Sequence, residues 1–318
     1  MKKTSVEWPD LPKIALNKPV SFLGSCFAEN VSTIFAQHGL FVNTNPFGVI
    51  FNPVSLQNLL LAHKNPLWLE ENTFLKEDVY LHWGTNSKLH GYSKLELLDK
   101  MHQQLAQFIA NLKESKVIFI TLGTAFAYEL VSNGAIVANC HKMPAQNFTK
   151  KMLSVEEVIA ACEGIVAEIE SIQPEIDLIW TISPVRHSKD GLAANSLSKS
   201  TLRLALTQVC SSHQNNYYLP VFEYFIDELR DYAWFSADGV HPNSIAIDSL
   251  WEQLINLFFT KENQVIQKQF YRLQQATNHQ PIHPTSKTNE VFQQKLQQEI
   301  TDFVANHGYL NVQPLKFE

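Results

Sequence analysis

The sequence has few cysteines and no long apolar segment. Its 318 residues include only four cysteines, Cys26, Cys140, Cys162 and Cys210, and none of them forms a Cys-x-x-Cys pair. This scarcity argues against a structural zinc site and against a disulfide framework, and it favours a reducing compartment. No run approaches the roughly 18 consecutive apolar residues of a membrane helix, so we expect no membrane partner.

An excess of positive charge is also missing. The chain carries 25 Lys and Arg against 31 Asp and Glu, a formal net charge of −6. It has no basic stripe, so we do not expect nucleic acid as a partner. The first ten residues hold two lysines but no apolar segment behind them, and we expect no signal peptide and a cytoplasmic protein. No Gly-x-Gly-x-x-Gly, phosphate loop or His-x-x-x-His pattern occurs, so we predict no nucleotide cofactor and no metal.

What is present is a regular alternation of apolar segments. Hydrophobic residues make up 45% of the chain, enough for a large core. Buried-strand patterns are expected at 18–26, 117–122, 176–182 and 217–222, and helical patterns at 28–38, 56–63, 95–112, 154–172, 195–211 and 245–259. Strands that alternate with helices predict the α/β class, here a three-layer α/β/α sandwich around a parallel sheet.

Two hairpins and a tail complete the expected organisation. One hairpin is predicted at 74–92, with its turn at 84–86, and a second at 127–138. After residue 260 the composition shifts toward Gln and Asn with weak helical patterns. We therefore predict a main domain of residues 1–260 and a C-terminal helical appendage of residues 261–318. This tail packs on the main domain or on a second subunit, which makes it a candidate for homo-oligomer formation.

A candidate nucleophile follows the first predicted strand. Gly24-Ser25-Cys26-Phe27-Ala28 comes directly after an apolar run and predicts a tight turn that opens a helix. Such a turn presents a side chain at the carboxyl edge of the sheet, where helix N–H groups favour a thiolate or an oxyanion. We expect this position to lower the pKa of Cys26. An N-cap serine followed by a buried cysteine explains the same residues equally well.

A candidate base lies far along the chain. Asp238-Gly239-Val240-His241-Pro242 places a carboxylate three residues before an imidazole in a glycine-containing loop. This spacing suits Asp238 for orienting the Nδ1–H of His241 while the other ring nitrogen faces a nucleophile. Because Asp and His both favour loops, ordinary turn chemistry is the alternative. We predict His241 as the general base, Asp238 as its orienting group, and Ser25 or Cys26 as the nucleophile.

Several uncommon motifs, in this order, resemble the GSCFA family over about residues 20–258. Besides the two segments above they are Asn45-Pro46-Phe47-Gly48, Thr121-Leu122-Gly123-Thr124, Asn139-Cys140-His141-Lys142, Ser183-Pro184-Val185-Arg186-His187 and Leu229-Arg230-Asp231-Tyr232. The family resembles a branch of the SGNH (GDSL-like) hydrolases. The resemblance implies a flavodoxin-like α/β/α sandwich and ester hydrolysis without a metal or other cofactor.

The resemblance also bears on the nucleophile and the oxyanion donors. The GDSL block has its nucleophile at the third position, which aligns with Cys26, whereas a one-residue shift of the turn presents Ser25. SGNH enzymes add donors from a glycine and an asparagine in two later blocks, and no Asn stands beside Gly123 here. Each candidate donor is equally explained by turn chemistry; the candidates are Gly24, Asn45, Gly48, Gly123, Thr124, Asn139 and His141.

Two further residues follow the strand that ends at Ile182. Arg186 is suited to a substrate carboxylate or phosphate, or alternatively to an ion pair with Glu228, Asp231 or Asp238. His187 is a candidate for a substrate contact. Together these residues predict an esterase acting on a small-molecule or carbohydrate ester. A carbohydrate O-acyltransferase and a non-catalytic ligand-binding relative are the alternatives.

Overall fold

The computed structural model describes residues 4–315 and contains a central sheet of five parallel strands. In spatial order the strands are β10 (Asn216–Tyr218), β9 (Asp177–Ile182), β5 (Val117–Leu122), β1 (Val20–Gly24) and β2 (Val42–Thr44). Counted along the chain as the first to fifth strand of this sheet, the order is 2-1-3-4-5, which is the flavodoxin-like arrangement. The predicted parallel sheet is therefore confirmed, with the run 117–122 at its centre.

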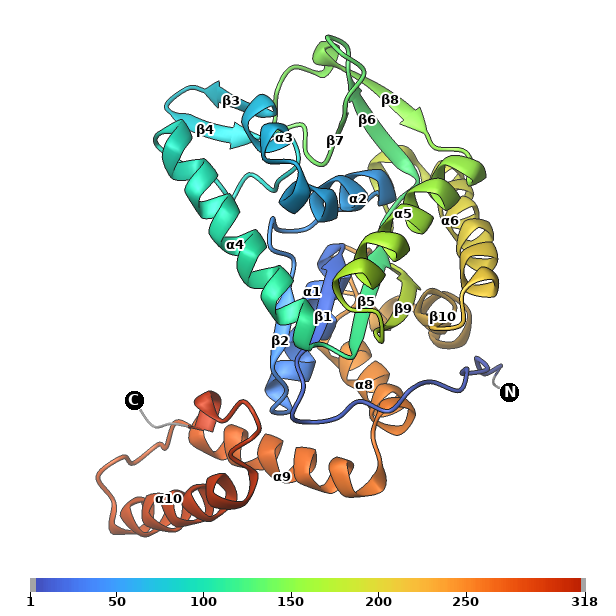
Figure 1. Ribbon diagram of the computed structural model, residues 1–318. Coiled ribbons are helices and arrows are strands. Elements are labelled where there is room, and N and C mark those ends of the chain that lie inside the picture. Colours follow the sequence, from blue (N-terminus) through green and yellow to red (C-terminus); the bar gives the residue numbers. More distant parts are fainter. Residues whose placement is uncertain (1–3, 316–318) are drawn as a thin grey trace.

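Helices cover both faces of the sheet (Figure 1). The helices on one face are α2 (Pro53–Leu61), α4 (Lys94–Glu114), α5 (Val155–Ile172) and α6 (Leu192–Ser212), and those on the other are α1 (Cys26–Gln37) and α8 (Ser244–Phe258). Alternate residues of a strand point to opposite faces, and accordingly Ile118 and Ile120 join one hydrophobic core while Val117 and Phe119 join the other. The three-layer prediction is confirmed.

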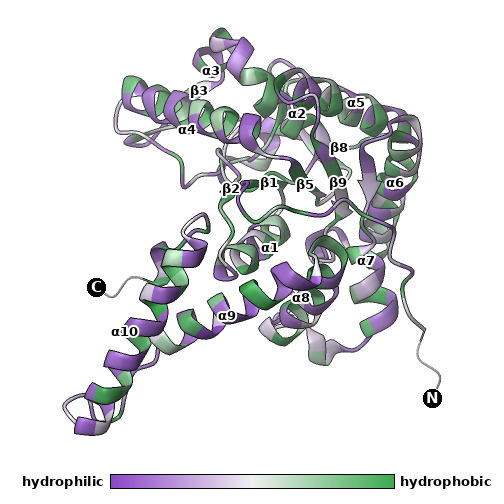
Figure 2. Ribbon diagram, turned by 60° about the horizontal axis from the view of Figure 1, so that its bottom comes forward, coloured by the Kyte–Doolittle hydropathy of each residue, from purple (hydrophilic) through white to green (hydrophobic). Residues whose placement is uncertain are grey.

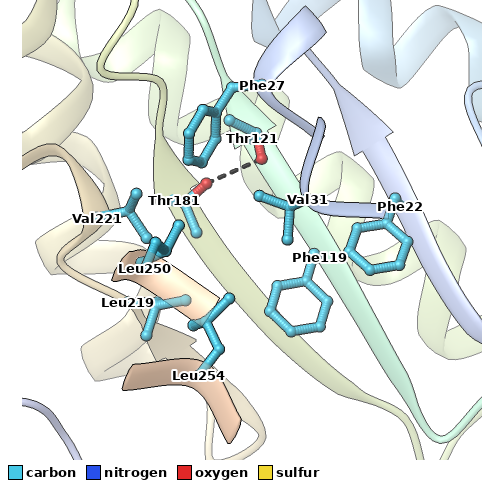
Figure 3. Close-up of a pocket in the computed structure, with 10 residues that line it drawn as sticks. All are labelled: Phe22, Phe27, Val31, Phe119, Thr121, Thr181, Leu219, Val221, Leu250 and Leu254. Atoms are coloured by element: carbon cyan, nitrogen blue, oxygen red, sulfur yellow. Dashed lines mark hydrogen bonds between the residues drawn. The ribbon is translucent and has the colours of Figure 1, made fainter. Parts of the chain in front are cut away.

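The layer between the sheet and helices α1 and α8 is closely packed (Figure 3). Its gap measures only about 10 Å³ and is lined almost entirely by apolar side chains. Between β9 and β5 the Thr181 hydroxyl donates a hydrogen bond to the Thr121 hydroxyl at 2.9 Å. A gap of this size holds about one water at most, so a ligand site must lie elsewhere.

Two small antiparallel sheets lie at the top of Figure 1. One pairs β3 (Thr73–Lys76) with β4 (Val79–His82), next to the short helix α3 (Pro66–Glu71); the other has the order β7 (Ile136–Val137), β6 (Phe126–Leu130), β8 (Phe148–Met152). After the predicted turn at 84–86 the chain returns to β4, where Gly91 pairs with Tyr80 in a single antiparallel bridge. The main hairpin was not predicted: it turns between Lys76 and Val79, with Glu77 at a φ of +53°. The hairpin predicted at 127–138 is present, with β8 added as a third strand.

Two helices form the C-terminal tail, α9 (Lys261–Thr277) and α10 (Lys287–His307). The ring of Phe270 packs on Gly39, just beyond the end of α1, and His38 stacks on Tyr271 at 4.6 Å. The tail thus lies at the opposite end of the sheet from the small sheets, and it extends outward from the body in Figures 1 and 2. The predicted helical character is confirmed, while the domain division at residue 260 stays a prediction.

The last strand and the segment before α8 depart from the regular pattern. β10 ends at Tyr218, earlier than the predicted 217–222, because Pro220 cannot donate a backbone hydrogen bond. The chain then forms α7 (Val221–Glu223), which continues as a π-helical segment, Tyr224–Leu229. β10 is also an edge strand of the sheet.

Candidate active site

Ser25 forms the N-cap of α1. Gly24 ends β1 at a φ of +123°, and the Ser25 backbone N–H donates to the Thr121 carbonyl at 3.1 Å. The Ser25 hydroxyl accepts a hydrogen bond from the Phe27 N–H at 3.3 Å, and the residue is only 1% exposed. Ser25 therefore has the capping role that the sequence offered as an alternative, and its hydroxyl is turned away from solvent.

Cys26, the first residue of α1, faces an open cleft and lies beside His241. Its Sγ is 3.8 Å from the His241 Nε2. Burial raises the pKa of the Cys26 thiol, and the nearby Glu29 carboxylate raises it further. Backbone N–H groups at the helix start, together with Lys199, lower this pKa but do not outweigh burial. The expectation that the helix N-terminus lowers the Cys26 pKa is wrong in its net sign, so the free thiol needs a base.

Asp238 orients the imidazole of His241. One carboxylate oxygen lies 2.7 Å from the ring Nδ1, and the other accepts the backbone N–H groups of Val240 and His241 at 2.9 and 3.0 Å. These two N–H donors and the ring hold the pKa of Asp238 at about 2. Because the carboxylate is ionised and accepts from Nδ1–H, the Nε2 of a neutral His241 is left as an acceptor toward the Cys26 sulfur.

The cleft around Cys26 and His241 has a volume of about 650 Å³. It lies over the carboxyl ends of β1, β5 and β9, where open α/β sheets bind their ligands. One wall comes from the small three-stranded sheet, through Phe126, Tyr128 and Val137. The hairpin predicted at 127–138 thus borders the cleft, whereas no residue of 74–92 lines it.

Two of the predicted backbone donors are already used around Asn45. The Gly24 N–H donates to the Asn45 side-chain oxygen at 2.8 Å, and the Gly48 N–H donates to the Asn45 carbonyl at 2.9 Å. Asn45 and Gly48 line a separate polar depression and are absent from the cleft that contains Cys26. We therefore withdraw Gly24, Asn45 and Gly48 as oxyanion donors.

The donors predicted at Gly123 and Thr124 are also occupied. Both backbone N–H groups donate to the Phe51 carbonyl, at 2.8 and 3.1 Å. The Thr124 hydroxyl lies 2.9 Å from that of Ser198 and accepts the Phe126 N–H at 3.0 Å. Although Thr124 lines the cleft, its polar groups hold the loop after β5 in place, and the prediction of free donors here is wrong.

His141 does not reach the cleft. Its Nδ1 lies 2.8 Å from the Ser87 hydroxyl and its Nε2 lies 2.9 Å from the His82 carbonyl, so both ring nitrogens are engaged. Only 2% of the residue is exposed. By contrast Asn139 lines the cleft, and its side-chain oxygen accepts the His141 N–H at 2.7 Å. Within residues 4–315 the Asn139 side-chain nitrogen has no hydrogen-bond partner, which leaves it available to a ligand.

Arg186 and His187 both line the cleft. Burial lowers the pKa of His187 to about 4, so its imidazole is neutral at pH 7. The ring of Phe51 packs edge-on against it, with centroids 5.5 Å apart. Among residues 4–315 none of the carboxylates forms an ion pair with Arg186, which removes the alternative of pairing with Glu228, Asp231 or Asp238.

Lys199 is a buried cation beneath the cleft that the sequence interpretation missed. Its Nζ donates to the carbonyls of Gly123 and Ser183, at 2.6 and 2.7 Å, which follow β5 and β9. On the same face of α6, the Asn195 side-chain oxygen accepts a hydrogen bond from the His187 N–H, and the Ser198 hydroxyl accepts one from the Ala125 N–H. One helix face thus fixes both loops that form the floor of the cleft.

Lys199 is expected to make stability depend on pH. Burial lowers its pKa to about 7, while an unfolded lysine titrates near about 10.4. Between these values the unfolded chain binds more protons, so the free energy of unfolding rises with pH, by up to about 1.4 kcal/mol per pH unit. Below about pH 7 both states are protonated and this dependence is absent.

Lys199→Met removes the buried ammonium, so its free energy of unfolding should lack this dependence on pH. Urea unfolding of both proteins at several pH values between 7 and 9 should show the wild type gaining relative to the variant as pH rises. Lys116→Met removes an exposed lysine that pairs with Glu175 and controls for the loss of one cation. Parallel pH dependences for the wild type and Lys199→Met would show that the ammonium is not destabilised by burial.

Residues 4–315 show neither a metal-binding cluster nor a membrane-spanning helix. No group of three or more His, Cys, Asp and Glu side chains in this part of the chain is arranged to hold a metal ion. None of its helices combines the length and the apolar character that a membrane-spanning segment requires.

Comparison with known proteins gives a family match in sequence and a set of similar solved structures. The profile of the GSCFA family matches residues 19–254. No curated protein matches the chain. An acetyl xylan esterase from the rumen bacterium Butyrivibrio proteoclasticus is similar in structure with a TM-score of 0.33 and 10% identity, over 65% of this chain and 56% of that one. A carbohydrate esterase of family 3 from Talaromyces cellulolyticus has a TM-score of 0.34 and 8% identity, over 76% and 97%.

Proposed function

Because the chain belongs to the GSCFA family and carries a thiol, an imidazole and a carboxylate in one cleft, we propose that it is an acyl-ester hydrolase of the SGNH type. Cys26 is the nucleophile, His241 the general base and Asp238 the positioning residue. The observation that carries the proposal is the chain of contacts from Asp238 Oδ2 to His241 Nδ1, 2.7 Å, and from Nε2 to the Cys26 sulfur, 3.8 Å.

The proposed reaction has two steps. The Cys26 sulfur attacks the acyl carbonyl while its proton passes to His241 Nε2, and the ester C–O bond breaks as the alcohol leaves with that proton. Water then attacks the thioester, giving its proton to His241, and the carboxylic acid leaves as the thiol is restored. The oxyanion of each tetrahedral intermediate lies at the start of α1, where the Cys26 N–H and the helix dipole stabilise negative charge.

A second donor to the oxyanion is available among the residues that line the cleft. The Asn139 side-chain nitrogen has no partner within the described residues and belongs to a residue that lines the cleft. An amide donor there has the chemistry of the SGNH asparagine, which this chain lacks beside Gly123. The same thioester also permits transfer to a sugar hydroxyl, since a cleft of about 650 Å³ is much larger than an acetyl group.

The proposal is tested by comparing the wild type and Cys26→Ala in the hydrolysis of an activated ester, p-nitrophenyl acetate. We expect this variant to lose at least about 10³-fold in kcat/KM, because removal of a nucleophile leaves only the stabilising groups. In the wild type, mass spectrometry after rapid acid quench should locate the acetyl group on Cys26. Addition of a sugar alcohol measures how the acyl group partitions between water and a hydroxyl.

Two variants serve as controls. Cys210→Ala removes a thiol outside the cleft whose pKa burial raises to about 12, so full activity is expected. Ser25→Ala removes the N-cap and should cost about 1 kcal/mol of stability, while the acetyl group still attaches to Cys26. Turnover that is unchanged in Cys26→Ala, or an acetyl group on Ser25, would contradict the proposal; an absence of turnover in the wild type favours a ligand-binding protein.

A further inference from the structure

Arg186 brings a positive charge to the cleft without a carboxylate beside it. The residue follows β9 and lines the cleft together with Cys26 and His241. Its guanidinium carbon lies 5.0 Å from the centre of the Phe235 ring and 6.0 Å from that of Tyr232. Both rings belong to the loop that leads into Asp238 and His241, so they hold the guanidinium near the candidate catalytic pair.

The hydrogen-bonding capacity of Arg186 is not satisfied by the described part of the protein. Its Nη1 is buried and has no hydrogen-bond partner. The three acids that the sequence offers as partners bond to other groups, Glu228 to the Val6 N–H, Asp231 to the Ala233 N–H and Asp238 to His241. An unsatisfied buried donor costs about 1–3 kcal/mol, and more when it is charged. Two aromatic faces offset only part of this cost.

The other groups that line the cleft do not neutralise Arg186. Lys189 adds a second cation, and the one acidic residue of the lining, Asp190, pairs with Lys150. His187 is neutral at pH 7, because burial lowers its pKa to about 4. Positive charge therefore gathers on one side of the cleft, in a protein whose overall formal charge is −6. Such a local field favours an anionic ligand.

We propose that the ester cleaved at Cys26 carries a carboxylate or phosphate group, and that Arg186 binds this anion while the acyl carbonyl lies at the sulfur. The inference rests on the proposed hydrolase function and adds the substrate class. A guanidinium presents its N–H groups in a planar fork that matches both anions with two parallel hydrogen bonds.

Three phenyl acetates that differ only at the para position test the substrate class. They are 4-acetoxybenzoate, 4-acetoxyphenyl phosphate and methyl 4-acetoxybenzoate, which carry a carboxylate, a phosphate and no charge. We expect kcat/KM for at least one anionic ester to exceed that for the neutral one by about 10- to 100-fold, the value of a charge-assisted hydrogen bond. The faster anion identifies which of the two groups the substrate carries.

Arg186→Met should bring the ratio of anionic to neutral kcat/KM close to one, and Arg186→Lys should retain part of it. If Arg186 only supports the aromatic loop, Arg186→Met will instead lower turnover of all three esters alike and leave the ratio intact. Arg203→Met is the matched control, because Arg203 also stacks on a ring, that of Tyr218, but pairs with Glu223 away from the cleft. It removes the same charge and should keep the wild-type ratio.

A binding measurement separates failure of this inference from failure of the proposed function. Iodoacetamide is uncharged and alkylates accessible thiols. Its rate of addition to Cys26, followed by mass spectrometry of the Cys26 peptide because Cys140 also lines the cleft, reports access to that thiol without any turnover. Inorganic phosphate or benzoate should slow this alkylation in the wild type and in Arg203→Met, but not in Arg186→Met. Cys26-dependent hydrolysis without an anionic preference, and without protection by either anion, would overturn the inference while leaving the hydrolase proposal standing.

Discussion

The His241→Ala variant is expected to cleave acyl esters about 10³- to 10⁴-fold more slowly than the wild type at neutral pH, as for the loss of a general base. The physical reason is the state of the nucleophile. Burial and the Glu29 charge raise the pKa of Cys26, so a thiol rather than a thiolate meets the substrate. Attack then requires that Nε2 of His241 remove the proton from the sulfur 3.8 Å away.

The pH dependence makes this prediction specific. Without the imidazole, attack depends on spontaneous ionisation of Cys26, so the rate of His241→Ala should keep rising above the ordinary thiol pKa of about 8.5. The rate of p-nitrophenyl acetate hydrolysis, measured from neutral pH to above this pKa, tests the prediction. His213→Ala is the matched control, since His213 contacts Glu163 at 2.5 Å in an imidazole–carboxylate pair outside the cleft. Equal rates for His241→Ala and the wild type would exclude His241 as the base.

The location of this pair follows from strongly patterned segments of the sequence. The run before Gly24 is uniformly apolar and ends at a glycine, and the run 117–122 is apolar throughout. Parallel strands end at a common edge, so the turn that carries Cys26 had to lie there. The placement of Asp238 before the last long helix of the main domain brought His241 to the same edge.

The backbone donors could not be predicted, because their availability depends on tertiary partners. Phe51, whose carbonyl accepts the N–H groups of Gly123 and Thr124, belongs to a loop with no strong pattern of its own. Likewise the side chain of Asn45 accepts the Gly24 N–H. A sequence shows that such groups stand near the edge of a sheet, but the choice of acceptor is made by packing between distant segments.

Lys199 was missed for a different reason. The helix at 195–211 was predicted, but it carries polar residues on more than one face, so its inner face could not be identified. The signal was the spacing of Asn195, Ser198 and Lys199, which lie on one face of a helix at i, i+3 and i+4. The hairpin turn at Glu77 and Asp78 was missed because it contains no Gly, Pro or Asn, the strongest of the residues that mark such turns.

Gly24→Ala is expected to have the largest effect on stability. A Cβ at this position would lie 2.1 Å from the Thr121 carbonyl oxygen, a backbone atom of the neighbouring strand β5. The φ of +123° is in addition unfavourable for any residue with a side chain. Relief requires that β1 move away from β5 in the middle of the sheet. We expect a loss of more than about 4 kcal/mol in the free energy of unfolding, or a chain that does not fold.

Gly134→Ala separates the clash from the backbone strain. Gly134 also has a positive φ, +72°, but a Cβ there meets no atom within 4 Å. This variant should lose only about 1 kcal/mol, measured for both by urea unfolding. A Gly24→Ala protein as stable as Gly134→Ala would contradict the close approach of β1 to Thr121.

Gly24 also ties stability to the proposed chemistry. The strand contact that excludes a Cβ is the one through which Ser25 donates to Thr121, and it fixes where α1 begins. A shift of β1 that relieves the clash therefore moves Cys26 relative to His241. Misplacement of a reacting group by about 1 Å can cost about 10²-fold in rate. Any folded Gly24→Ala protein should accordingly show slower acylation of Cys26, whereas Gly134→Ala, which leaves the turn intact, should lose stability alone.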